Sequence, residues 1–198
     1  MKNNPTWILI HCSDYPLSKM FDQFLSINQW HKERGFPLSR AGWYVGYQKV
    51  VTGDKLYTAR EDDEVGAHCN QHQDGLSMNF QSLGICVGFD GDVELPSSMQ
   101  YALLQKQVWD WQDKYKIPND HVQFHRHWAV DKTCPGSLIT SKWLTELLKR
   151  PQVVEVPPKP ISTSCIAQEK IIEDQKKEIW FLKTLIENLY RYCRAKFS

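Results

Sequence analysis

Apolar runs and helical apolar repeats alternate along residues 1–150 of the chain. The runs Trp7–Cys12 and Ser82–Phe89 are bounded by polar residues, which is typical of buried strands. His121–His125 is a shorter segment, and it predicts a third strand. His11 lies near the end of the first run, at a strand end where side chains commonly open into a cleft.

Two segments separated by turn residues predict a β-hairpin. They are Trp43–Val51 and Lys55–Ala59, and the Thr-Gly-Asp turn at 52–54 joins them. The acidic run at 61–64 is expected to be a solvated loop. The segment Gly66–Phe80 is rich in His, Asn, Gln and Gly, which predicts a long polar loop of the kind that often carries binding residues.

Three segments carry the signals of helices. The first, Ser18–Arg34, stops at Gly35. The second, Ser98–Lys116, is capped by Ser97 and keeps apolar residues at helical spacing. Thr140–Arg150 predicts a third helix, packed against the core. The apolar side of the first helix is expected to consist of Phe21, Phe24, Leu25 and Ile27.

The alternation of strands and helices predicts an α/β domain over residues 1–150, with a mixed central β-sheet flanked by helices. The length of 198 residues allows one such domain and an appendage. A hydrophobic content of 41% is ample for a packed core.

The chain changes character at Pro151. Four prolines within ten residues make 151–164 an extended, semi-rigid linker. Cys165–Lys196 contains no Gly or Pro and repeats apolar residues every seven positions, so residues 165–198 predict a C-terminal amphipathic helix with a coiled-coil pattern. The two heptad series are Ile172, Ile179, Ile186 and Cys193, and Gln175, Leu182 and Leu189.

The heptad pattern favours self-association as a parallel dimer, because Ile and Leu predominate at its two core positions. Ile171, Leu185 and Tyr192 widen the apolar stripe, which leaves a higher oligomer or docking on the first domain as alternatives. The basic and aromatic end RYCRAKFS leaves contact with a bacterial membrane as a third alternative. Balanced charges along the rest of the helix count against that contact.

Charge and cysteine usage exclude several classes of protein. A net charge of +1 argues against a nucleic-acid-binding protein held by bulk electrostatics. The six cysteines form no CxxC pair, which predicts reduced thiols and no disulfide framework. The N-terminal apolar run WILI is too short for a signal peptide, and nothing reaches transmembrane length. We therefore expect a protein made in the cytoplasm.

His11, His125 and Cys134 are candidate ligands of a tetrahedral metal ion. Zinc takes imidazole nitrogen and thiolate sulfur, and a site with three protein ligands leaves the fourth position to water, as in catalytic centres. Taken alone, each residue has a simpler explanation, since free cysteines and strand-end histidines are often packed core residues. The three together, with the cation of Lys132 in the same loop, indicate a zinc hydrolase.

Six motifs follow one another between Thr6 and Lys149. They are IHCS at His11, QWHKERGF at 29–36, VGYQKVV at Tyr47, VGAHC at His68, NFQSLGIC at 79–86 and HRHWAVDKTCPG at 125–136. In this order they resemble the zinc-dependent N-acetylmuramoyl-L-alanine amidases. That family also contains the peptidoglycan recognition proteins and a small coliphage lysozyme that is an amidase.

The resemblance implies hydrolysis of the amide between the lactyl group of N-acetylmuramic acid and L-alanine of the stem peptide. It assigns one zinc ion to His11, His125 and Cys134, and catalytic roles to Tyr47 and Lys132. Lys132 is expected to stabilise the oxyanion of the tetrahedral intermediate electrostatically. Tyr47 is expected to hydrogen-bond either the attacking water or the oxyanion.

The chain departs from the family pattern at two places. Cys86 stands where some relatives carry a glutamate base, which moves the site toward the coliphage type and leaves the proton shuttle open. The spacing from His125 to Cys134 is one residue longer than in some relatives, so His127 is an alternative ligand.

The remaining polar residues of interest have simpler or secondary roles. His68 and Asn79 are candidate substrate-binding residues. His31 and His72 are expected on the surface. Cys12 follows a ligand on the opposite face of its strand, so it is expected to pack in the core.

Two functions from different classes fit these motifs. The first is an endolysin-like enzyme that acts on the host cell wall and reaches it with the help of a separate membrane-permeabilising protein. The second is a peptidoglycan-binding module without catalysis, as some recognition proteins are. Cys134, Lys132 and Tyr47 together favour the enzyme.

Overall fold

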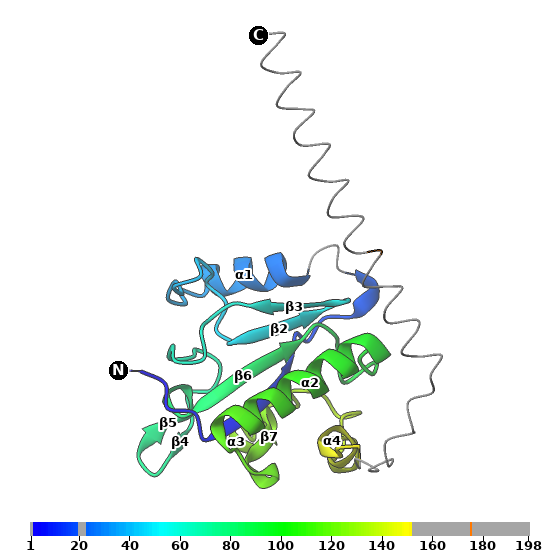
Figure 1. Cartoon of the computed structure of the whole chain (residues 1–198). Helices are drawn as coiled ribbons and strands as arrows, with labels where there is room; N and C mark the ends of the chain where they lie inside the picture. Colours follow the sequence, from blue (N-terminus) through cyan, green and yellow to red (C-terminus); the bar gives the residue numbers. More distant parts are fainter. Residues whose placement is uncertain (1, 20–22, 152–174, 176–198) are drawn as a thin grey trace. The chain divides into compact units, whose positions relative to one another are not determined.

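The computed structural model describes residues 2–19, 23–151 and 175 (Figure 1). The chain divides into two units, Met1–Arg150 and Pro151–Ser198, and the first contains the fold considered below. Apart from residues 151 and 175, the predicted linker and heptad-patterned helix lie outside the described residues.

The central sheet has five strands in the order β3-β2-β6-β1-β7. β2 and β3 pair antiparallel, whereas β1 is parallel to both β6 and β7, and β2 is parallel to β6. The predicted fold class, a mixed sheet flanked by helices, is confirmed. The bounds are β1 Trp7–Cys12, β2 Lys49–Thr52, β3 Lys55–Thr58, β6 Ser82–Val87 and β7 Val122–Phe124.

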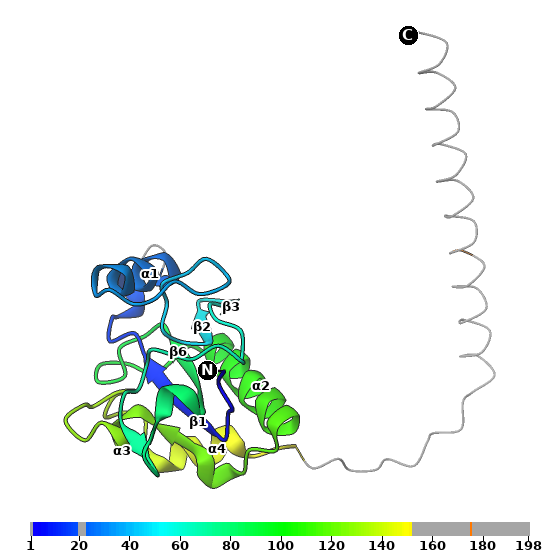
Figure 2. The same cartoon turned by 90° about the vertical axis from the view of Figure 1, so that its left-hand side faces the viewer.

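The α-helices lie around this sheet (Figure 2). α2 begins with the predicted cap: Ser97 Oγ accepts from the N–H of Gln100, whose side chain accepts from the N–H of Ser97. Within the described residues, no helix is both long enough and apolar enough to span a membrane. The bounds are α1 Gln23–Glu33, α2 Ser98–Tyr115, α3 His125–Trp128 and α4 Ser141–Leu148, with 3-10 turns at Leu17–Lys19, Met78–Phe80 and Asn119–His121.

α2 and α4 cover one face of the sheet, and α2 crosses in front of it in Figure 1. Because side chains alternate along a strand, every second residue of β1 and β6 points to this face. Cys12 belongs to this core, as predicted. Its main members are Ile8, Ile10, Leu83, Ile85, Val87, Leu104, Val108, Trp111 and Leu147.

α1 and the segment before β6 cover the opposite face. Phe24 and Ile27 of α1 pack in a cluster with Cys86 of β6. Leu9 of β1 packs with Cys69 and Met78, which belong to the segment before β6. This alternation therefore turns His11 of β1 to the α1 side of the sheet.

The first strand of the predicted hairpin is shorter than expected, because the segment 43–48 lies outside the strand. The backbone of this segment forms hydrogen bonds with side chains of α1 instead. The N–H of Tyr44 donates to Asn28 Oδ1 over 2.7 Å. The N–H of Gly46 donates to His31 Nδ1 over 3.0 Å. These side chains satisfy backbone groups that a strand would pair with a neighbouring strand.

Three further boundaries or exposures differ from the sequence prediction. α1 begins at Gln23, after a separate 3-10 turn, and Phe21 lies outside the described residues. Leu25 is 52% exposed, because one residue is a 100° rotation along a helix and Phe24 already faces the sheet. His125 begins α3 and is not part of β7.

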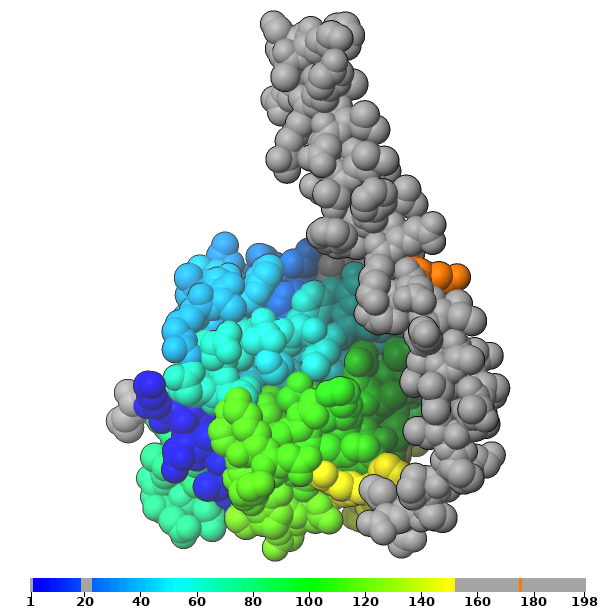
Figure 3. Space-filling view, viewed as in Figure 1, coloured from blue at the N-terminus to red at the C-terminus, as the bar shows by residue number. Residues whose placement is uncertain are grey.

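The predicted polar loop Gly66–Phe80 contains a small antiparallel hairpin of β4 (His72–Gln73) and β5 (Leu76–Ser77). The N-terminal segment lies between this hairpin and α2 on the face seen in Figure 3. There the N–H of Asn4 donates to the carbonyl of Phe80 over 3.0 Å. The loop is therefore more ordered than its composition indicated.

The acidic run 61–64 is not simply a solvated loop, because Asp62 joins it to α2. Burial alone would raise the pKa of the Asp62 carboxyl, but hydrogen bonds from Lys114, Tyr115 and Trp111 outweigh burial and lower it. The donor distances lie between 2.8 and 3.1 Å. Sequence composition could not reveal these partners, which lie about fifty residues away along the chain.

His31 is buried, contrary to the prediction, with an exposed fraction of 7%. Its ring stacks on Phe36, and Nδ1 accepts the N–H of Gly46. Burial, followed by the charges of Arg34 and Arg60, lowers the pKa of His31 to about 4. The neutral ring therefore holds α1 against the segment before β2.

We predict that Asp62→Ala lowers the free energy of unfolding by about 2 kcal/mol, because it removes a charged acceptor and leaves the buried Trp111 N–H unpaired. Urea denaturation measures this loss. Asp63→Ala is the matched control and should cost less, since the ion pairs of Asp63 with Lys2 and Arg40 lie at the surface. Equal losses would contradict this role of Asp62.

We also predict that His31 makes the fold acid-sensitive. Its folded pKa of about 4 is below the unfolded value of 6.5, so the unfolded chain binds the proton first and stability falls as pH drops from 6.5 to 4. His31→Asn keeps an acceptor for Gly46 and should show a shallower fall in unfolding free energy. The exposed His72→Asn serves as control, and parallel curves for wild type and His31→Asn would refute the prediction.

Candidate metal centre and active-site cavity

Two candidate ligands lie at the ends of adjacent parallel strands. Ile10 of β1 pairs with Phe124 of β7. His11 and His125 are the next residues in the two segments, so they lie next to each other. Their ring centroids are 4.4 Å apart. The parallel sheet thus brings together two imidazoles that are 114 residues apart in sequence.

The loop after α3 delivers Cys134 to the same place. The N–H of Arg126 donates to the carbonyl of Cys134 over 2.8 Å. The guanidinium of Arg126 donates to the carbonyls of Thr133 and Gly136. Gly91 lies so close that a Cβ atom at Gly136 would be 1.9 Å from its carbonyl carbon. The backbone and side chain of Arg126 therefore hold this loop in place.

His11, His125 and Cys134 together fit a tetrahedral metal ion. Their ligand atoms all lie within 4.8 Å of one another. Cys134 Sγ is 3.8 Å from His11 Nδ1, and tetrahedral zinc would require about 3.6 Å between sulfur and nitrogen. His127 is exposed beside Trp128 and does not belong to this group.

The protonation states of the two histidines suit metal binding. Burial, followed by the neighbouring histidines, lowers the pKa of His11 well below its usual value. Burial and the Lys132 cation lower the pKa of His125. Both rings are therefore neutral at neutral pH, which is the form that binds a metal.

The sulfur needs to lose its proton before it can bind a metal. The hydrogen bond with the Cys12 thiol, together with burial, raises the pKa of Cys134 well above its usual value. The backbone N–H of Cys12 points at Cys134 Sγ over 3.4 Å. A divalent cation would compensate for the cost of the buried thiolate, so metal and proton compete for this atom.

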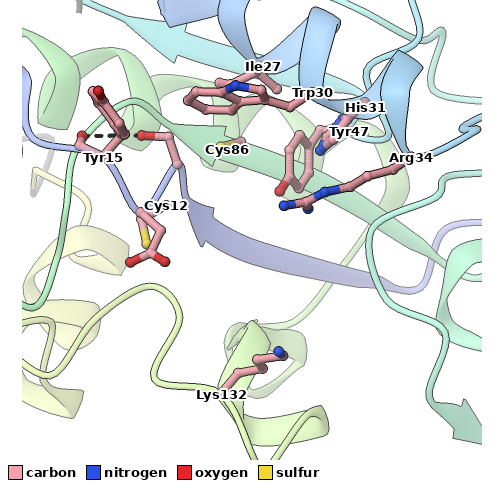
Figure 4. Close-up of a pocket in the computed structure, with 11 residues that line it drawn as sticks. Cys12, Tyr15, Ile27, Trp30, His31, Arg34, Tyr47, Cys86 and Lys132 are labelled. Atoms are coloured by element: carbon pink, nitrogen blue, oxygen red, sulfur yellow. Dashed lines mark hydrogen bonds between the residues drawn. The ribbon is translucent and has the colours of Figure 1, made fainter. Parts of the chain in front are cut away.

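A cavity of about 440 Å³ opens beside Cys12, on the α1 side of the sheet (Figure 4). Tyr47 and Trp30 lie on one side of it, and Lys132 lies on the opposite side. Both residues predicted to be catalytic therefore line the cavity, and their roles stay predictions. The lining consists of Cys12, Ser13, Asp14, Tyr15, Ile27, Trp30, His31, Arg34, Tyr47, Cys86 and Lys132.

Tyr47 is a neutral hydrogen-bond donor. Its ring centroid is 4.9 Å from that of His11. Burial, followed by the nearby Cys86, raises the pKa of Tyr47 well above its usual value. Burial also raises the pKa of Cys86 well above its usual value. Cys86 is fully buried and neutral, so it does not replace a glutamate as a base.

His68 and Asn79 are absent from the lining of this cavity. His68 is buried, and its Nδ1 is 3.1 Å from Nε2 of His11. Burial, with His125 and Arg60, lowers its pKa to about 3. Asn79 Oδ1 accepts the N–H groups of His68 and Cys69. His68 thus contacts His11 directly, whereas Asn79 contacts the backbone of the segment that carries His68.

The cavity also contains residues that the sequence prediction did not assign to the site, namely Trp30, His31, Arg34 and Tyr15. A helical signal for His31 was present in the sequence, because it follows Ile27 by four positions on the same face of α1. The ring of Tyr15 lies 5.6 Å from that of Trp30, so the two form an aromatic wall. No local pattern marked Tyr15, which reaches the wall from the loop after β1.

Solved structures of amidases and recognition proteins are similar to this fold. N-acetylmuramoyl-L-alanine amidase LysC from Clostridium intestinale URNW is 22% identical, with a TM-score of 0.57 over 73% of this chain and 85% of that chain. A Drosophila PGRP-LB mutant in complex with tracheal cytotoxin is 23% identical, with a TM-score of 0.56 over 70% and 82%. The Ph2119 endolysin from Thermus scotoductus MAT2119 bacteriophage Ph2119 is 19% identical, with a TM-score of 0.53 over 75% and 87%.

At these identities the structural likeness concerns the fold. The comparison with curated proteins gives no match. The family model described as N-acetylmuramoyl-L-alanine amidase matches residues 1–137. This match covers more than half of the chain and includes all three candidate ligands. The chain belongs to the N-acetylmuramoyl-L-alanine amidase family.

Proposed function

We propose that this protein is a zinc-dependent amidase that hydrolyses the bond between N-acetylmuramic acid and L-alanine in bacterial peptidoglycan. The observation that carries the proposal is the convergence of His11, His125 and Cys134 beside a cavity that also presents Tyr47 and Lys132. Family membership supports the reaction, and the ligand set supports the metal.

The ligand set has the composition of a catalytic centre. His11, His125 and Cys134 would hold Zn²⁺, which when bound lowers the pKa of a coordinated water to about 7 and polarises the scissile carbonyl. Three protein ligands leave one position for the reaction.

Tyr47 and Lys132 act on the substrate from two sides of the cavity. The scissile amide develops negative charge on its oxygen during attack, and a cation held nearby stabilises that charge. Lys132 supplies the cation, and Tyr47 supplies a neutral O–H donor because burial keeps it protonated. We therefore assign Tyr47 to the oxyanion as donor and not to the water as base.

The similar structures support peptidoglycan as the substrate class. One of them is a recognition protein in complex with tracheal cytotoxin, and another is a phage endolysin. We propose an endolysin-like role in which the protein, made in the cytoplasm, lyses the wall after a separate protein has permeabilised the membrane. Self-association remains a prediction of the heptad pattern in residues 165–198, and membrane contact remains a prediction of the basic and aromatic end RYCRAKFS.

A binding module without catalysis is the second candidate, since recognition proteins share this fold. The two candidates differ in one product. An amidase releases new L-alanine amino termini from peptidoglycan, whereas a binding module sediments with peptidoglycan and leaves it intact.

We predict that Cys134→Ala abolishes both zinc content and the release of L-alanine amino termini from purified peptidoglycan, because the site loses its thiolate. The matched control is Cys69→Ala, which removes a buried thiol outside the candidate ligand group. It should retain both properties. A wild-type protein that loses its zinc to a chelator and still cleaves would contradict the zinc mechanism.

We further predict that Tyr47→Phe and Lys132→Gln retain zinc while kcat falls by about 10² to 10³, as expected when one donor to an oxyanion is removed. Zinc analysis and single-turnover cleavage measure the two effects separately. Normal kcat in either variant would remove that residue from the reaction.

A further inference from the structure

His68 contacts the ring nitrogen of His11 that faces away from Cys134. The two rings meet edge to face at 84°, with His11 Nε2 3.1 Å from His68 Nδ1. His68 is 9% exposed and does not line the cavity.

The orientation of His11 determines which nitrogen carries the proton. Nδ1 faces Cys134, and Nε2 faces His68. A metal ion bound at Nδ1 leaves the proton of the neutral ring on Nε2. That N–H then donates to Nδ1 of His68. The opposite arrangement, with His68 donating, would place a proton on the nitrogen that the metal needs.

The backbone around His68 is built to hold its ring in this position. A Cβ atom at Gly84 would lie 2.6 Å from Cδ2 of His68, and one at Gly66 would lie 2.5 Å from the same atom. Only glycine leaves room for the ring at these two places. Asn79 Oδ1 accepts the N–H groups of His68 and Cys69 over 2.8 and 2.9 Å.

The second ring nitrogen of His68 indicates that a contribution to stability does not by itself account for a histidine at this position. Nε2 of His68 is buried, and it has no hydrogen-bond partner among the described residues. When Nδ1 accepts from His11, Nε2 carries a proton with no acceptor. A buried donor without a partner lowers the stability of the fold. We therefore look for the role of His68 in its contact with His11.

We propose that His68 is a positioning residue that accepts the Nε2–H of His11 and so fixes the tautomer and ring orientation that present Nδ1 to the metal. Asn79 fixes the loop that carries His68. This inference rests on the proposed zinc function and gives both residues a role other than the substrate contact predicted from the sequence.

A histidine in this position differs chemically from the carboxylate often found behind metal-binding histidines. A neutral imidazole accepts the hydrogen bond without adding negative charge. With one thiolate ligand and two neutral histidines, a zinc site keeps a net charge of +1 in this arrangement. A carboxylate at position 68 would cancel that charge.

The test compares His68→Leu with His68→Asn in the full chain. Leu and Asn have similar shapes, but only Asn has an oxygen near the position of Nδ1. Zinc affinity, measured by competition with a chromogenic chelator, should fall by about 10- to 100-fold in His68→Leu and be largely restored in His68→Asn. Urea denaturation without metal should give the two variants similar stabilities. If His68 had only a structural role, the difference in zinc affinity would be accompanied by a difference in stability.

A zinc affinity of His68→Leu equal to that of wild type would overturn the inference while leaving the proposed function intact. Wild type that binds no zinc would overturn both. If His68→Leu fails to fold, ¹⁵N NMR of zinc-loaded wild type decides: an unprotonated Nδ1 of His68 that accepts the Nε2–H of His11 is expected, and a proton on Nδ1 of His68 would refute the proposal. Release of L-alanine termini by wild type tests the amidase separately.

Discussion

The pairing of β1 between β6 and β7 is the constraint on which the rest of the site depends. Parallel register puts His11 beside Cys86 on one side and beside the start of α3 on the other. Strand alternation then separates an apolar face under α2 from a face that carries His11. A slip of one residue in β1 would turn His11 toward α2 and away from the α1 side of the sheet.

Much of the fold could be predicted from local patterns. The continuous run Trp7–Cys12 and the cap at Ser97 each determine structure within a few residues, and both predictions are confirmed. The errors arise where distant side chains decide. Asp62 and His31 bond to partners from other elements, and these partners change a presumed loop and a presumed surface residue into buried contacts.

The sequence was sufficient to predict which residues form the candidate site, but not which of them contact one another. Motif order was sufficient to select His11, His125 and Cys134, and the structure brings them together. The sequence could not show that His68 lies behind His11 and outside the cavity, since this depends on Gly66 and Gly84 leaving room for a ring. Motif resemblance identifies which residues belong near a site, whereas packing determines the atom that each one contacts.

The central claim is that one thiolate and two imidazoles hold zinc with a position left open. X-ray absorption at the zinc edge of the loaded protein tests it most directly. We expect one sulfur at about 2.3 Å and three nitrogen or oxygen neighbours at about 2.0–2.1 Å. Two sulfur neighbours would mean that Cys12 joins Cys134 as a ligand and closes the site, and a shell without sulfur would exclude Cys134; either result would contradict the account.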